Sequence, residues 1–453
     1  MSQPAPRLLR GVGRWSLVAL FINVTIGAGI FGLPSKVYAL VGPYSLLTYL
    51  ICAALIGLIV LCFAEVGSRF TETGGSYLYA HAAFGAPAGF VIGWLMWLRT
   101  LFAFAALSNL FVVYLSHFWP AAEAWRVAVI AGVLLLLNAP NLRGVRETAR
   151  FSNVLTVGKL AALAIFVLAG AFAARSSSVA LGPLPTRQAF ATAALLLIFA
   201  FQGFERVLVV TGEVRESRRN IPFALFTAIG VVTVLYVAIQ LICILTLPDL
   251  ARSERPLVEA SGRLLGTAGA SGIAIAALLS ILGSLTITVL AGPRVLFAMS
   301  EQGQLPRVLS TVHPRFRTPH VAILVTACLM LVVSLASTFL SALTIASLII
   351  VLVYAATCAA LPVLRRKHPD RSGGFRVPGG VPVALVSVAL CLWLMTGSTW
   401  RELRDVAIAA ALGLPLYAAR GWPRRAVRER AAAAAAEGEA APGPGLTSGL
   451  EAR

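Results

Sequence analysis

Repeated apolar segments of about twenty residues constrain the fold of this chain more than any other feature of its sequence. A segment of that length can cross the hydrocarbon core of a bilayer as a helix. Hydrophobic residues make up 58% of the chain and charged residues only 12%, which soluble globular proteins do not show. The sequence therefore predicts an all-α integral membrane protein with twelve transmembrane helices, at about residues 15–35, 43–66, 86–114, 124–141, 152–173, 189–210, 222–247, 269–293, 321–338, 341–363, 382–399 and 404–420.

The basic residues lie between the apolar segments. A formal net charge of +19 at pH 7 would by itself suit a nucleic-acid partner, but the arginines are concentrated in alternate loops. That pattern marks the cytoplasmic side of a membrane protein. We therefore expect no nucleic-acid partner, a multi-pass location in the bacterial cytoplasmic membrane, and both termini in the cytoplasm. The expected termini are a short segment at 1–14 and a tail at 421–453, whose Ala-, Pro- and Gly-rich composition predicts disorder.

No sequence pattern indicates catalysis or metal binding. The six cysteines all lie in apolar runs, where a buried thiol acts as a small hydrophobic group. The histidines and aspartates lie in or near loops, whereas an integral-membrane enzyme needs acid–base groups or ligands at membrane depth. A channel would need a filter sequence or a regular charge pattern, and neither is evident. We expect no catalytic residue, no metal site, no cofactor and no obligatory protein partner.

Two apolar segments are interrupted by glycine at corresponding places. The first interruption is Thr25-Ile26-Gly27-Ala28-Gly29, and the second is Phe199-Ala200-Phe201-Gln202-Gly203. A helix break inside a bilayer frees backbone polar groups, so it persists only where it faces protein or a cavity. Paired breaks in two halves of a chain point to a transporter's substrate site. The alternative is that Gly27 and Gly29 only allow close helix packing.

A broken helix offers free N–H groups at one new end and free carbonyls at the other. The first end suits a carboxylate and the second suits an ammonium group, so two such breaks suit a zwitterionic amino acid. The two interrupted segments are five spans apart and enter the membrane from opposite sides. This predicts inverted repeats at about 15–173 and 189–363, with two extra helices at about 382–420, in a transport domain spanning 15–420.

Three charged residues stand out by their depth inside the predicted spans. Lys159 lies about two turns into the fifth span, and Glu205 lies just beyond the second break. Charges at that depth are costly and are candidates for function by default. Lys159 is a candidate for proton release during transport, unless its side chain reaches the interface by snorkelling. Glu205 is a candidate for gating, proton relay or contact with a cationic substrate, with a purely structural role as the alternative, and its neighbour Arg206 offers charge compensation. Arg99 in the third span has no evident role.

Several motifs in this order resemble the amino acid–polyamine–organocation superfamily of secondary transporters, over nearly the whole chain apart from the two tails. Two departures from that pattern concern the breaks: Ala28 stands where many members have serine, and Gln202 where small or apolar residues are common. The motifs are Ile26 to Phe31, Ala64-Glu65, Gly74 to Tyr79, Phe84-Gly85, Gly93-Trp94, Phe199 to Glu205, Glu213 to Pro222, Arg294 to Pro306 and Thr318-Pro319.

The resemblance implies the LeuT-type fold of five plus five inverted helices, and movement of amino acids by alternating access. It implies a substrate carboxylate near the amides of Ala28 and Gly29. The substrate ammonium would lie near the carbonyls of Thr25, Phe199 and Gln202. Ile26, Gly27 and Gly203 complete the substrate-binding set that we expect from the two breaks.

The resemblance also implies roles for four side chains. Phe199 matches an aromatic lid, and Glu205 a gating carboxylate. Lys159 matches a lysine of proton-coupled members, with Ser284 as its expected partner in the eighth span. We therefore expect a proton-coupled amino acid symporter, whose partners are an amino acid, protons and membrane lipid. The alternative is an exchanger in which Lys159 is a fixed structural cation.

Overall fold

The computed structural model describes residues 13–70, 75–143, 148–173, 182–207, 217–367 and 375–418. Within these ranges the side chains of 140, 142–143, 148–157, 173, 206–207, 217–218 and 418 are not described. All regular structure in the described ranges is helical, as predicted. The expected tail at 421–453 and most of the expected segment at 1–14 lie outside the described residues.

A helix lies at each predicted apolar segment, and the segments with breaks are divided into shorter helices. The helix bounds follow the predicted segments to within a few residues at most ends. They are α1 Arg14–Thr25, α2 Gly29–Val41, α3 Ser45–Ser68, α4 Ser76–Phe84, α5 Ala86–Leu115, α6 Arg126–Arg143, α7 Thr148–Ala173, α8 Arg187–Phe201, α9 Phe204–Val207, α10 Ser217–Thr246, α11 Pro256–Glu301, α12 His320–Ala336, α13 Phe339–Lys367, α14 Gly380–Met395, α15 Trp400–Ala411 and α16 Gly413–Ala418.

Not every helix is long enough to cross a membrane alone. Within the described residues, five helical stretches have the length and hydropathy of a membrane span, or six if the bent pair from α14 to α16 counts as one. A further five apolar helices have 10–17 residues. The breaks explain two of these, since α1 stops after 12 residues and α8 after 15, and a span needs about twenty. The count of twelve spans therefore stays a prediction.

Three local features differ from the sequence-based expectation. Helix α4 lies between the second and third predicted segments, and its nine residues are too few to appear as an apolar run. Helix α11 begins well before residue 269, because an extra helical stretch continues through a kink at Gly266, where φ is 69°. The chain bends by 115° between α14 and α15, and Thr399 caps the N-terminus of α15.

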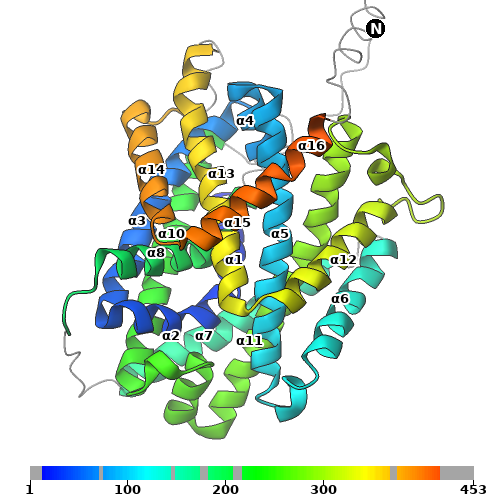
Figure 1. Cartoon of the computed structure of the whole chain (residues 1–453). Helices are drawn as coiled ribbons and strands as arrows, with labels where there is room; N and C mark the ends of the chain where they lie inside the picture. Colours follow the sequence, from blue (N-terminus) through cyan, green and yellow to red (C-terminus); the bar gives the residue numbers. More distant parts are fainter. Residues whose placement is uncertain are drawn as a thin grey trace, which may run out of the picture.

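Helix α5 is central to the packing. It packs against α13, α11, α12 and α4, and α3 packs against α8, α10 and α13. Figure 1 shows α5 in the middle of the view, beside helices whose colours place them late in the sequence. The first and second halves of the chain therefore interleave around one core instead of forming separate domains.

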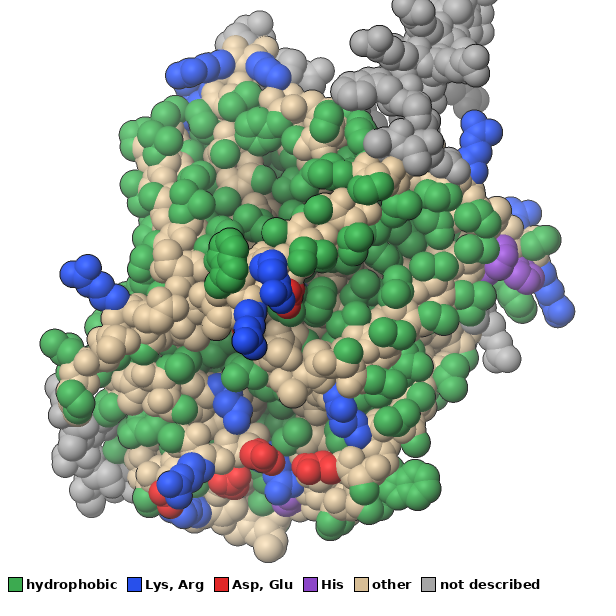
Figure 2. All heavy atoms as spheres, viewed as in Figure 1, with side chains coloured by type: hydrophobic (Ala, Val, Ile, Leu, Met, Phe, Trp, Pro, Cys, Tyr) green, Lys and Arg blue, Asp and Glu red, His purple; other side chains and the backbone are tan. Residues whose placement is uncertain are grey.

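The outer surface has the character expected of a helix bundle in lipid. Large apolar side chains such as Leu135, Phe172 and Val234 are 70–71% exposed. Figure 2 shows hydrophobic side chains over most of one face, with many of the charged side chains near its upper and lower ends. A contiguous exposed apolar surface of this kind is unusual for a soluble monomer, so the structure supports a membrane environment.

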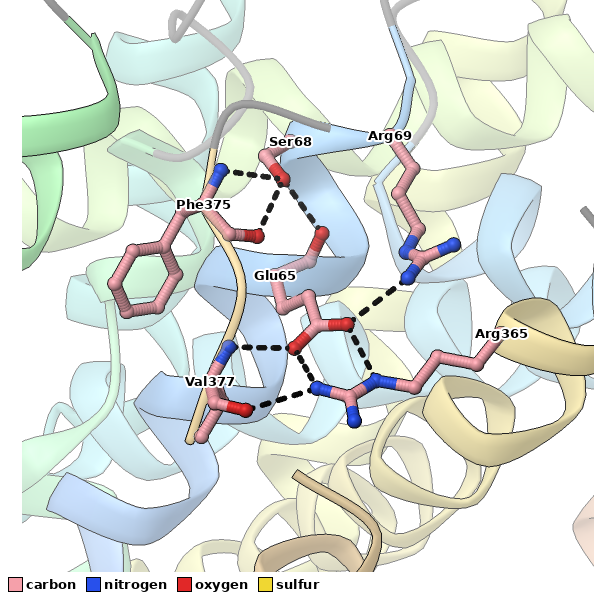
Figure 3. Close-up of polar contacts among 6 residues, drawn as sticks. All are labelled: Glu65, Ser68, Arg69, Arg365, Phe375 and Val377. Atoms are coloured by element: carbon pink, nitrogen blue, oxygen red, sulfur yellow. Dashed lines mark hydrogen bonds and ion pairs between the residues drawn. The ribbon is translucent and has the colours of Figure 1, made fainter. Parts of the chain in front are cut away.

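A buried carboxylate joins three parts of the chain where α3 and α13 end (Figure 3). Glu65 is 1% exposed, and its carboxylate accepts hydrogen bonds from Arg365 at 2.6 and 2.8 Å and from Arg69 at 3.0 Å. It also accepts from the Val377 amide at 2.8 Å, just before α14. A nearby hydroxyl, that of Ser68, contacts the Phe375 backbone. The carboxylate thus fixes α3, α13 and the approach to α14 to one another.

We predict that Glu65→Ala lowers the stability of the folded protein strongly. Removing one partner of a buried ion pair costs about 3–5 kcal/mol, because the remaining charges lose their compensation. Thermal unfolding of the purified protein in detergent measures the effect, with Glu254→Ala in an exposed loop as the control. Equal melting temperatures for the two variants would contradict this role of Glu65.

Candidate functional site at the two helix breaks

The first break separates α1 from α2, as predicted. Helix α1 ends at Thr25, and the backbone of Ile26 leaves the helical region with ψ at 81°. The Gly27 amide donates to the Thr25 carbonyl at 2.8 Å, and α2 begins at Gly29. The amides that begin α2 therefore have no acceptor within their own helix.

The second break separates α8 from α9, again as predicted. Gln202 is extended, with φ at −74° and ψ at 164°, and Gly203 follows with φ at 121°. Residues other than glycine rarely adopt such a φ. The Gly203 amide donates to the Glu205 carboxylate at 2.8 Å, so it is not available to the Phe199 carbonyl at the end of α8.

The two breaks lie against each other. A Cβ atom on Gly29 would lie 3.0 Å from the Ala200 Cα, and one on Gly203 would lie 2.8 Å from the Val24 carbonyl oxygen. Glycine is therefore needed for this close approach of two backbones as well as for the breaks. The packing interpretation fits Gly29, whereas a Cβ on Gly27 would lie at an ordinary contact distance of 3.6 Å from the Ser284 hydroxyl oxygen. The functional interpretation of these glycines stays a prediction.

A cavity of about 50 Å³ lies where the breaks meet. On this scale one water molecule needs roughly 10–15 Å³, so the cavity has room for a small ligand. Its walls come from both breaks, from α5 and from α11. The lining residues are Val24, Thr25, Gly27, Ala28, Gly29, Arg99, Ala103, Leu107, Phe199, Gln202, Gly203, Ser284 and Thr288.

The structure brings together most of the predicted site residues. Of the eight expected at the breaks, seven line the cavity, and only Ile26 does not. Ile26 is fully buried, and its carbonyl faces Lys159 instead. Ser284 lines the cavity, whereas Lys159 and Glu205 lie behind its walls. These placements describe geometry, and the roles expected for the residues stay predictions.

Tyr236 joins the two breaks, a contact that sequence reasoning missed. It is fully buried on α10, and its hydroxyl lies 3.1 Å from the Thr25 carbonyl oxygen and 3.2 Å from that of Ala200. One O–H is thus shared between carbonyls freed at both breaks. A tyrosine in an apolar span carries no sequence signal of such a contact.

Lys159 pairs with backbone carbonyls at the end of α1. Its ammonium donates to the Asn23 carbonyl at 3.0 Å and to the Ile26 carbonyl at 2.6 Å, and the residue is 8% exposed. A cation is favourable there because the C-terminal end of a helix carries negative charge. The Ser284 hydroxyl donates to the Ser280 carbonyl of its own helix at 3.0 Å. Among the described contacts, no hydrogen bond joins Lys159 to Ser284.

Arg99, for which the sequence indicated no role, has polar partners in the structure. It is 6% exposed on α5, and it donates to the Gln202 side-chain oxygen at 2.5 Å. The Glu205 carboxylate lies 3.5 Å from the same Arg99 nitrogen. Tyr354 on α13 donates to that carboxylate at 3.1 Å. The side chain of Arg206, a candidate partner of Glu205 by sequence, lies outside the described residues.

Among the described residues, no group of three or more His, Cys, Asp or Glu side chains could hold a metal ion. The polar groups at the cavity are backbone amides and carbonyls, three hydroxyls, one amide side chain and one guanidinium. Such a set can bind a small polar molecule by hydrogen bonds and charge.

Residues 12–402, which include both breaks, match the family described as amino acid permease. The chain belongs to this family. It therefore has relatives that carry solutes across membranes, and with its many apolar helices it is a multi-pass membrane protein.

Three bacterial relatives, all of Bacillus subtilis (strain 168), match over most of their length. The methylthioribose transporter is 29% identical over 418 residues, 87% of this chain and 90% of that protein. The branched-chain amino acid permease BcaP is 26% identical and covers 90% of this chain and 92% of its own. The serine/threonine exchanger SteT is 27% identical, with coverages of 90% and 96%.

We predict that Gly203→Ala abolishes or strongly reduces function and lowers stability. The new Cβ would meet the Val24 carbonyl at 2.8 Å in a backbone conformation with φ at 121°, and strain of this kind costs about 1–3 kcal/mol before any clash is relieved. Gly230→Ala is the matched control, because a Cβ there meets nothing within 4 Å. Thermal unfolding and solute uptake by the two variants should differ clearly. Equal melting temperatures and equal uptake by the two variants would show that the two breaks can move apart without loss of stability or function.

Proposed function

We propose that this protein is a secondary active transporter that moves amino acids across the bacterial cytoplasmic membrane by alternating access. The transport domain spans 15–420, with twelve transmembrane helices arranged as inverted repeats at 15–173 and 189–363 and two extra helices at 382–420. Both termini lie in the cytoplasm. The observation that carries the proposal is that two broken helices, far apart in the sequence, face one cavity.

The free backbone groups support a zwitterionic substrate. The amides of Ala28 and Gly29 lie at the start of α2, where the helix dipole favours a carboxylate. The Phe199 carbonyl at the end of α8 and the neighbouring Gln202 carbonyl suit the ammonium group. The Thr25 carbonyl contributes less than expected, since it already accepts from Gly27 and Tyr236.

Two residues beside the cavity are proposed to gate it. The Phe199 side chain comes from the last turn of α8 and lines the cavity wall, where an aromatic lid would lie. Glu205 is anchored to the break by the Gly203 amide and to α13 by Tyr354. Movement of α13 relative to the second break would therefore change the contacts of Glu205.

We propose proton-coupled symport, with Lys159 as the proton carrier and Ser284 as a nearby polar group. The support is that the only ammonium described at this depth lies against the first break, 2.6 Å from the Ile26 carbonyl. Protonation would favour the closed contact between α7 and α1. Loss of the proton would release this contact. The charge state of Lys159 would thus be coupled to the conformation of the break.

Exchange is the second candidate. It is favoured by the observation that Lys159 already has two carbonyl partners, as a fixed structural cation would. One relative, SteT, is described as a serine/threonine exchanger. In an exchanger, Lys159 would keep its proton throughout the cycle.

Uptake by purified protein in proteoliposomes tests both the transport function and its coupling. We predict saturable uptake of at least one of the twenty amino acids, accelerated by an inward proton gradient. In Lys159→Ala this acceleration should disappear, while Lys367→Ala, which alters a lysine at the end of α13, should retain it. Full acceleration in Lys159→Ala would refute the coupling role. Counterflow at a rate independent of the pH gradient would favour exchange, and absence of saturable uptake would refute the transport function.

A further inference from the structure

The cavity contains one buried cation whose hydrogen bonds are incomplete. Of the residues that line the described cavity, Arg99 alone is charged. Its Nη2 donates to Gln202, but its buried Nε has no hydrogen-bond acceptor in the described structure. A buried donor without a partner costs about 1–3 kcal/mol, so the hydrogen bonding of this guanidinium beside the cavity is incomplete.

The neighbouring carboxylate does not complete these bonds. Glu205 uses its Oε2 atom to accept from Gly203 and Tyr354. Its Oε1 atom lies 3.5 Å from Arg99 and accepts no hydrogen bond from the residues that the structure describes. The carboxylate thus compensates part of the Arg99 charge while leaving guanidinium donors available. An arginine held in this way can recognise an additional oxygen acceptor.

Arg99 lies on a different wall from the backbone groups assigned to the substrate's carboxylate and ammonium groups. Those groups belong to the two breaks, whereas Arg99 comes from α5 beside Ala103 and Leu107. The remaining lining side chains are aliphatic, aromatic, hydroxyl or amide groups. The guanidinium is therefore the strongest polar feature that is left for a substrate side chain.

We propose that Arg99 determines substrate specificity by hydrogen bonding to an oxygen in the substrate side chain. This inference rests on the proposed amino acid transport. The favoured substrates are small amino acids with a side-chain hydroxyl, amide or carboxylate oxygen, in keeping with a cavity of about 50 Å³. Apolar amino acids of the same shape are disfavoured because they offer the guanidinium no additional acceptor. Cationic amino acids are disfavoured by charge repulsion.

Isosteric substrate pairs test this assignment in the full-length protein. Threonine and valine differ by a hydroxyl against a methyl group, and asparagine and leucine have similar shapes. Uptake in proteoliposomes gives the ratio of kcat/KM within each pair. We expect the wild type to prefer the oxygen-bearing member about tenfold to hundredfold, the range for a hydrogen bond to a charged group.

The double variant Arg99→Leu/Glu205→Gln should reduce each ratio to within about threefold, since it removes both charges and leaves neither buried alone. Arg99→Lys keeps the charge and should retain part of the preference. Arg404→Gln alters an arginine whose side chain is 54% exposed and should leave the ratios unchanged. Ligand-induced thermal stabilisation by threonine against valine provides the same comparison if a variant folds but transports slowly.

The outcomes separate the two proposals. Equal uptake of both members of each pair by the wild type would overturn the role of Arg99 while leaving amino acid transport intact. A ratio that survives in the double variant, or a uniform loss of all substrates in Arg99→Lys, would also overturn it, because Arg99 would then serve the fold or the common carboxylate. Absence of saturable uptake of any amino acid by folded wild-type protein would instead refute the proposed function.

Discussion

Backbone groups freed at the two helix breaks must find partners in an interior from which water is largely removed, and the rest of the site depends on how they are paired. Each partner comes from a different helix. Tyr236 on α10 bridges carbonyls of both breaks, Lys159 on α7 pairs with the end of α1, and the Glu205 carboxylate binds the Gly203 amide. An unpaired group would cost several kcal/mol at such a place. The pairing therefore holds α7 and α10 against the two breaks.

The same pairing leaves a few groups free, and those groups give the site its chemistry. The amides that begin α2 and the Phe199 carbonyl have no partner within their helices, and they are the groups proposed to bind the two ends of a zwitterion. The Glu65 cluster ties α3 to α13 and the approach to α14 elsewhere in the molecule. One set of polar contacts thus stabilises the helix bundle, and the other forms a site whose contacts a ligand can replace.

Relatives at 26–29% identity are described as carriers of methylthioribose, branched-chain amino acids, or serine and threonine. The family therefore accommodates different solutes, and the side chains on the cavity walls are where such differences can arise. In this chain the unusual wall is Arg99 with Gln202, the residue that departs from the superfamily pattern before the second break. The departure has a physical reason in the structure, because the amide oxygen accepts from the buried guanidinium.

The sequence by itself determined the helical class, the approximate helix positions and both breaks, because long apolar runs and glycine-rich interruptions act locally along the chain. It also singled out Lys159, Glu205 and Arg99, since a charge inside an apolar run is conspicuous. Only the tertiary structure decided that Arg99 approaches Gln202 and Glu205 and that Tyr236 joins the breaks. Such contacts depend on how helices far apart in the sequence pack, and the geometry of that packing is not encoded in any single apolar segment.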